Sequence, residues 1–145
     1  MQIRKGFISD LNEIYQLEKI IFKNEAWTQE MLKMELLDNE YTKTLIIEEH
    51  RSILGYIMSR SVFEEHHILN VGVLPQRQKE GIGTILLSSF LKSIKNTSSV
   101  FLEVKKSNFH AIKLYKTNGF KVFDQRKNYY KDGSSALMMN YCKVY

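Results

Sequence analysis

The segment Leu69–Thr84 constrains the fold of this 145-residue chain more than any other part of its sequence. An apolar run ends at Pro75, and a polar loop then leads into a helical pattern that opens with Gly81-x-Gly83. A helix N-terminus presents unpaired N–H groups and the positive end of the helix dipole, and glycines let a ligand approach the backbone. We therefore expect this segment to hold phosphate groups.

Two positively charged residues, Arg77 and Lys79, precede the glycines and favour an anionic ligand. The segment is not a P-loop, because no Gly-Lys-Ser/Thr follows the glycines. It is not a dinucleotide-binding fingerprint either, since that motif needs a third spaced glycine and an acidic residue after the next strand. On the glycines alone, an ordinary loop that leads into a helix is the alternative interpretation.

The periodicity of the apolar residues predicts strands and helices along the whole chain. Their order, β-α-α-β-β-β-α-β-α-β-β, indicates an α/β domain with a largely central sheet. Strands are expected at Met1–Gly6, Thr42–Glu49, Ser52–Val62, Ile68–Leu74, Ser99–Val104, Phe120–Arg126 and Ser135–Cys142. Helices are expected after Asp10, after Thr28, from Gly81 and after Asn108.

Polar residues and glycine are expected to mark the helix ends. Asp10 with Glu13 three residues later resembles a capping box, with Asp in place of Ser or Thr. Asn108 offers a cap for the helix that follows it. The dipeptide Asn118-Gly119 supplies the left-handed exit from that same helix.

Composition narrows the class of protein. The net charge of +5 favours an anionic partner, which could be nucleic acid, a phosphorylated cofactor or a ribonucleoprotein surface, although a lysine-rich solvated surface gives the same count. The sequence lacks a run of the roughly 20 apolar residues that cross a membrane, and its N-terminus lacks the apolar stretch of a signal peptide. Together with a single cysteine, Cys142, this predicts a cytoplasmic protein of one domain, residues 1–145.

The pattern Gln78-x-x-Gly81-x-Gly83 resembles the acetyl-CoA-binding signature Q/R-x-x-G-x-G/A of the GNAT acetyltransferases. The expected order of elements resembles that fold over nearly the whole chain. The resemblance implies a central mixed, mostly antiparallel sheet of about seven strands with flanking helices. It also implies acetyl-CoA as the acyl donor, with no metal.

The resemblance assigns contacts with the cofactor. In that family the strand before the signature splays from its neighbour and holds the pantetheine with its exposed backbone groups, here those of Val71, Gly72 and Val73. The signature loop would wrap the pyrophosphate, and it comprises Gln78, Lys79, Glu80, Gly81, Ile82, Gly83 and Thr84. Asn108 would contact the cofactor near the start of its helix, and Tyr115 would contact it from the same helix, which faces the thioester.

A second segment, LEVKKSNFHAIKLYKTNGF at residues 102–120, resembles a run found in ribosomal-protein-alanine N-acetyltransferases, the RimI-like family. Ala26-Trp27-Thr28 resembles the P-W-S/T of that family's substrate-binding region, and Lys127-Asn128-Tyr129-Tyr130 resembles its R-x-Y-Y. The resemblance implies acetylation of the N-terminal alanine of a small-subunit ribosomal protein. It places Trp27, Tyr129 and Tyr130 at the substrate.

The chemistry of acetyl transfer gives roles to two residues of this segment. A protein α-amine is largely protonated at pH 7, so it must lose a proton before it attacks a thioester. Glu103, at the end of a strand, is the candidate general base, and Tyr115 is the candidate general acid for the departing thiolate. By analogy with the family, the Val73 N–H would stabilise the oxyanion. Outside this context Glu103 could be an edge carboxylate and Tyr115 a core residue.

The match departs from the family after the tyrosine pair. Asp132-Gly133-Ser134-Ser135-Ala136 is less acidic than the D-G-x-E/D-D-A-like stretch of the family, and acidic residues would be expected to meet the arginine that follows the substrate's alanine. Glu25, Glu35, Asp38 or Asp132 could compensate. The sequence alone does not choose among these four carboxylates.

Two other functions stay open. The same fold could acetylate another amine, such as a different protein N-terminus, a lysine or a small metabolite, because one scaffold hosts all of these. A non-catalytic module that binds RNA or the ribosome is the other alternative, suggested by the charge of +5. Neither a membrane partner nor direct nucleic-acid binding is expected, and the oligomeric state is not indicated.

Overall fold

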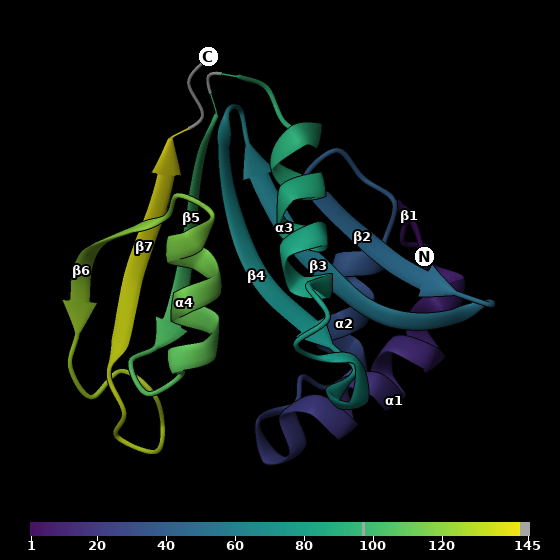
Figure 1. The fold of residues 1–145 in the computed structure, drawn as a ribbon, viewed down its shortest axis with the longest axis horizontal. Coiled ribbons are helices and arrows are strands. Elements are labelled where there is room, and N and C mark those ends of the chain that lie inside the picture. The colour runs from purple at the N-terminus through teal and green to yellow at the C-terminus, as the bar shows by residue number, and fades with distance from the viewer. Residues whose placement is uncertain (97, 143–145) are drawn as a thin grey trace.

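The computed structural model describes residues 1–96 and 98–142. It contains one seven-stranded sheet of order β1-β2-β3-β4-β5-β7-β6 (Figure 1). The strands are β1 (Gln2–Lys5), β2 (Thr42–Glu49), β3 (Ser52–Val62), β4 (Glu65–Val73), β5 (Ser99–Lys105), β6 (Lys121–Arg126) and β7 (Ala136–Cys142). Strands β4 and β5 pair in parallel and the other neighbours pair antiparallel. The expected mixed, mostly antiparallel sheet is confirmed.

Four helices cover the two faces of this sheet. They are α1 (Leu11–Phe22), α2 (Gln29–Leu36), α3 (Ile82–Ser93) and α4 (Phe109–Thr117), with 3-10 turns at Ile8–Asp10, Lys23–Glu25 and Pro75–Arg77. Helices α3 and α4 lie on the near face in Figure 1, and α1 and α2 lie on the far face. Each pair of helices closes its own hydrophobic core against the sheet.

A β-bulge in β4 sets which of its side chains faces which core. Ser59 pairs with Ile68 but Met58 pairs with Asn70, so Leu69 is the extra residue. The extra residue reverses the alternation of side chains. Ile68 and Val71 therefore both pack into the core under α3, while Asn70 turns to the opposite face and bonds a residue of α1.

The expected strand bounds agree closely, with one clear difference in β4. The residues Thr42–Glu49 and Ser52–Val62 form β2 and β3 as expected. Strand β4 begins at Glu65, three residues before the expected start. The reason is a tight turn with Phe63 at φ 56°, which lets Val62 pair directly with Glu65.

The predicted helix caps have mixed outcomes. Asn108 caps α4, because its Oδ1 accepts from the Ala111 N–H at 3.2 Å. The capping box of Asp10 and Glu13 is wrong. The Asp10 carboxylate instead accepts from the Phe7 N–H at 2.8 Å, and Glu13 accepts from the Ile53 N–H at 2.7 Å, so Glu13 ties α1 to β3.

Candidate active site at the split between two strands

The sheet opens between its two parallel strands. Strands β4 and β5 are paired from Glu65 with Ser99 as far as Ile68 with Leu102, and the rest of each strand has no partner across this gap. The separation therefore begins at the bulge in β4, which is the kind of feature that bends a strand away from its neighbour. The gap lies at the centre of the sheet, with α3 and α4 on either side of it (Figure 1).

Backbone groups of β4 face this gap. The Leu74 N–H donates to the Leu54 carbonyl at 2.8 Å, which makes this a hydrogen-bonded pair of the antiparallel β3–β4 ladder. Because such pairs alternate with non-bonded ones, Val71 and Val73 direct their N–H and C=O groups away from β3. On the side that β5 has left, the strand thus directs the N–H and C=O of Val71 and the N–H of Val73 toward the gap, while the Val73 carbonyl accepts from Gln78.

The N-terminus of α3 lies beside these groups. Gly81 caps the helix with φ 81°, a left-handed conformation that glycine adopts without steric cost, and Lys79 also has a positive φ of 72°. The side chain of Gln78 folds back, and its Nε2 donates to the Val73 carbonyl at 3.1 Å. One end of the signature loop is thereby fixed to the end of β4.

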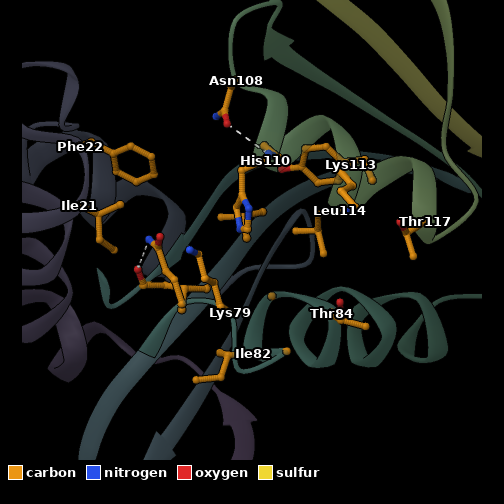
Figure 2. A pocket seen from close by; sticks show the side chains of 17 residues that line it. Ile21, Phe22, Lys79, Ile82, Thr84, Asn108, His110, Lys113, Leu114 and Thr117 are labelled. Carbon is orange, nitrogen blue, oxygen red and sulfur yellow. Dashed lines mark hydrogen bonds between the residues drawn. The ribbon is translucent and has the colours of Figure 1, made fainter. Parts of the chain in front are cut away.

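A cavity of about 720 Å³ joins the split, the signature loop and α4 (Figure 2). It is lined by Ile21, Phe22, Val71, Val73, Gln78, Lys79, Gly81, Ile82, Gly83, Thr84, Asn108, His110, Ala111, Lys113, Leu114, Tyr115 and Thr117. Ten of the residues predicted to bind the cofactor belong to this lining. Its size and its mixture of apolar and cationic walls suit a ligand with a long apolar arm and phosphate groups.

Two predicted cofactor residues do not line the cavity. Gly72 is buried behind the wall, where a Cβ would lie 2.7 Å from the ring of Tyr56. Glu80 turns to Arg77, whose Nε lies 2.8 and 2.9 Å from the two carboxylate oxygens. Arg77 also pairs with Glu49 at 3.2 Å, so its charge is shared between two carboxylates.

Tyr115 lies on α4 and faces the cavity from the core under α3. Its side chain is 8% exposed and packs against Phe120, with the ring centroids 5.7 Å apart. Burial raises the pKa of its hydroxyl to about 12. The tyrosine therefore holds its proton throughout the neutral range and can donate a hydrogen bond or a proton into the cavity.

Glu103 lies on β5 with its side chain on the opposite face of the sheet. Its neighbours Leu102 and Val104 point into the core under α3, so alternation places Glu103 on the face of α1 and α2. A hydrogen bond to Glu103 raises the pKa of Tyr129 above its ordinary value. The pKa of Tyr130 is also raised, first by burial and then by the Glu103 charge. The rings of the two tyrosines meet edge to face at 5.2 Å.

Lys105 connects three segments beside Glu103. Its ammonium pairs with Glu25 from the turn after α1, and with Asp132 from the loop between β6 and β7 at 3.0 Å. It also lies 5.4 Å from the centre of the Tyr130 ring. These pairs raise the pKa of Lys105. Hydrogen bonds from Ser134, and then from Lys105, hold the pKa of Asp132 well below its usual range.

The four carboxylates expected to compensate for the lost acidic residues divide into two groups. Glu25 and Asp132 lie beside Glu103 through their pairs with Lys105. Glu35 is buried and bound by Arg60, and Asp38 pairs with Lys5 near β1. Glu35 and Asp38 are thus paired with cations other than Lys105 and belong to other parts of the fold.

Glu18 is a buried carboxylate that sequence reasoning did not single out. It is 1% exposed on α1 and accepts hydrogen bonds from Asn70 Nδ2 at 2.9 Å and from the Trp27 N–H at 2.8 Å. The hydroxyl of Tyr56 donates to Oε1, the same carboxylate oxygen that accepts from Asn70. Glu18 therefore holds together β3, the bulged part of β4 and the segment that contains Trp27.

The cavity also contains residues that the sequence did not suggest. They are Ile21, Phe22, His110, Ala111, Lys113, Leu114 and Thr117. Those on α4 follow Asn108 at the spacing of one helix face, which is the signal that could have found them. Trp27, Tyr129 and Tyr130 lie outside the lining. Glu103 groups with Tyr129 and Tyr130 rather than with the cavity.

The described residues also bear on metal binding and on membrane insertion. Residues 1–96 and 98–142 contain no group of three or more His, Cys, Asp or Glu side chains arranged to hold a metal ion. In the same residues, no helix is long and apolar enough to cross a membrane.

Comparison with known proteins agrees with this architecture. The model of the acetyltransferase (GNAT) family matches residues 8–120. A Bacillus subtilis protein provisionally named a ribosomal protein bS18-alanine N-acetyltransferase is 32% identical over 140 residues, which cover 94% of this chain and 92% of that protein. An N-alpha-acetyltransferase of Sulfurisphaera tokodaii is 31% identical over 157 residues, with 95% and 90% covered.

Among solved structures, the ribosomal-protein-S18-alanine N-acetyltransferase of Escherichia coli superposes with a TM-score of 0.91. The match covers 99% of this chain and 94% of that one, at 24% sequence identity. At this identity the likeness is evidence for the fold.

Proposed function

The chain belongs to the GNAT acetyltransferase family and is an acetyl-CoA-dependent N-acetyltransferase, and from this premise we propose that its acceptor is the N-terminal α-amine of a protein. The proposed substrate is a small-subunit ribosomal protein with N-terminal alanine. Membership in the family speaks against the alternative of a non-catalytic RNA-binding module.

The observation that carries the proposal is the position of Glu103 on β5, one residue past the last pair with β4 and beside an aromatic pair. Its carboxylate bonds Tyr129, and the charge of that carboxylate acts on Tyr130. Two tyrosines beside a carboxylate give an extended peptide both an apolar surface and an acceptor for its ammonium group. The names of both relatives, which refer to acetylation of an alanine or of an α-amine, support the same acceptor class.

In the proposed reaction, each face of the sheet provides one proton transfer. Glu103 accepts a proton from the acceptor ammonium, directly or through a water molecule, and leaves a nucleophilic amine at the split. The Val73 N–H, directed away from β3, donates a hydrogen bond to the acyl oxygen. The amine nitrogen bonds to the acyl carbon and loses its second proton to water as the C–S bond breaks. Tyr115 donates its proton to the departing thiolate and regains one from water, because its raised pKa of about 12 keeps it protonated until that step.

The proposed cofactor contacts follow the cavity wall. Val71 and Val73 would bond the amide groups of the pantetheine arm with their backbone. The N-terminus of α3, from Gly81, would bind the pyrophosphate with its unpaired N–H groups. Asn108 already accepts from the Ala111 N–H, which leaves its side-chain amide N–H groups for the ligand.

The test is thiol release from acetyl-CoA by the purified protein in the presence of a hexapeptide that begins Ala-Arg-Tyr. The matched control is the same peptide with its α-amine already acetylated. Peptide-dependent release, with the added mass on the α-amine, is the expected result. Turnover of a polyamine or a lysine side chain, with none of the free peptide, would assign the enzyme to another amine.

A further inference from the structure

Helix α4 directs a row of residues into the cofactor cavity. His110, Lys113, Leu114 and Thr117 recur at intervals of one helical turn, and all four line the cavity (Figure 2). The row faces the start of α3 closely, since a Cβ on Gly83 would lie 3.2 Å from Leu114 Cδ2. The two basic residues of the row, His110 and Lys113, therefore lie across the cavity from the N-terminus of α3.

The ionisable side chains at the polar part of the cavity wall are basic. Its lining contains Lys79, His110 and Lys113, and it contains neither Asp nor Glu. In the part of the chain that the structure describes, none of these three side chains makes an ion pair with a carboxylate. Basic side chains that converge on one cavity without a carboxylate partner favour an anionic ligand.

The signature loop supplies little of this charge. Arg77 is engaged by Glu80 and Glu49, so its charge is balanced on the outer side of the loop. Lys79 is then the cation that the loop directs to the cavity. A nucleotide that carries several phosphate charges is bound more tightly when basic side chains add to one lysine and a helix terminus.

We propose that His110 and Lys113 form a second anion-binding wall, which binds phosphate groups at the nucleotide end of coenzyme A. The inference rests on the proposed function for the identity of the nucleotide. The N-terminus of α3 with Lys79 binds from one side, and the row on α4 binds from the other. Coenzyme A carries its negative charge on a pyrophosphate and a 3′-phosphate, and either group can meet this wall.

The experiment is a direct binding titration, by calorimetry, of coenzyme A and of 3′-dephospho-coenzyme A. The variants are His110→Gln and Lys113→Gln, both at exposed positions where the fold is expected to persist. The matched control is Lys116→Gln, which removes an exposed lysine of the same helix that does not line the cavity.

We expect Lys113→Gln to weaken coenzyme A binding about threefold to tenfold, and Lys116→Gln to change it less than twofold. The dependence of Kd on NaCl concentration should also become shallower in Lys113→Gln, because one screened attraction has been removed. A loss confined to coenzyme A assigns the wall to the 3′-phosphate. An equal loss for both ligands assigns it to the pyrophosphate.

The inference is overturned if His110→Gln and Lys113→Gln weaken neither ligand more than Lys116→Gln does. This outcome is separate from failure of the proposed function. If wild-type protein binds coenzyme A through this wall but does not acetylate the Ala-Arg-Tyr peptide, the acceptor assignment fails and the wall stands. If the peptide is acetylated and the variants bind coenzyme A as the wild type does, the proposed function stands and the inference about His110 and Lys113 fails.

Discussion

The two sides of the β4–β5 split are built in different ways. The proposed cofactor side consists largely of main-chain groups, at Val71, Val73 and the N-terminus of α3, which the secondary structure itself holds in place. The proposed acceptor side consists of side chains from the turn after α1, from β5 and from the loop before β7, joined by the ion pairs of Lys105. Substitutions should therefore act on the two sides in different ways.

Replacing Tyr115 with Phe should have the largest effect, since it removes the one proton donor assigned to the cofactor side. We expect kcat to fall by roughly 10²-fold to 10³-fold. The Kd for acetyl-CoA should change less than twofold, because the main-chain contacts remain. Stopped-flow detection of the thiol and calorimetry would measure the two quantities.

The raised pKa of Tyr115 also predicts how kcat depends on pH. Burial raises that pKa to about 12, so the acid stays protonated as the pH rises from 8 to 10. The kcat of the wild type should not decline over that interval. A decline there that is absent from Tyr115→Phe would mean that the hydroxyl titrates lower and faces water.

Replacing Glu18 with Gln should lower the free energy of unfolding by about 2–3 kcal/mol, because a buried carboxylate with three donors loses its charge. Urea titration would measure it, with Glu30→Gln on the exposed part of α2 as the control. We also expect a higher KM for the peptide, since the Trp27 segment loses an attachment. Unchanged stability would show that the carboxylate is not needed to join the two sides.

Replacing Glu103 with Gln should lower kcat/KM for the peptide about tenfold to hundredfold at pH 7. Activity should recover toward pH 9, where the acceptor amine loses its proton without help. A pH–rate profile would record this, with Asp124→Asn on β6 as the control. A constant loss at every pH would instead give Glu103 a binding role.

Replacing Lys105 with Met should have the smallest effect on stability, below about 1 kcal/mol, because its partners are exposed. Freeing Glu25 and Asp132 makes the acceptor side more negative. The KM for a peptide with arginine at its second position should then fall about twofold to threefold, with the KM for acetyl-CoA unchanged. Lys106→Met is the control. A shift in both KM values would contradict the separation of the two sides.

The fold of the proposed cofactor side could be predicted from the sequence better than that of the proposed acceptor side. A strand pattern that stops at Pro75 and a helical pattern that opens at Gly81 are local features, so the turn and the start of α3 could be predicted from adjacent residues. Strands β2 and β3 were predicted to the residue for the same reason. The basic residues of α4 that line the cavity, His110 and Lys113, were not predicted, because only Asn108 and Tyr115 of this helix were considered as site residues.

The acceptor side depends on contacts between distant residues. Lys105 meets Glu25 across 80 positions of the chain and Asp132 across 27, and no local pattern encodes these pairs. The bulge at Leu69 is similarly hidden, because alternation alone would place Ile68 and Asn70 on one face. Local pattern also fails within a helix at Glu13. The spacing of this residue fits a capping box, but its carboxylate accepts a hydrogen bond from β3 instead.

The wall formed by Val71 and Val73 has a consequence for how such an enzyme diversifies. The N–H and C=O groups that these two residues direct away from β3 belong to the main chain, so no substitution there other than proline removes them while the strand persists. If the proposed acceptor side is correct, point mutations at residues such as Glu25 or Tyr129 alter the amine that is accepted, while the donor of the acetyl group is inherited unchanged. One lineage can in this way explore many acceptors and keep the same acyl donor.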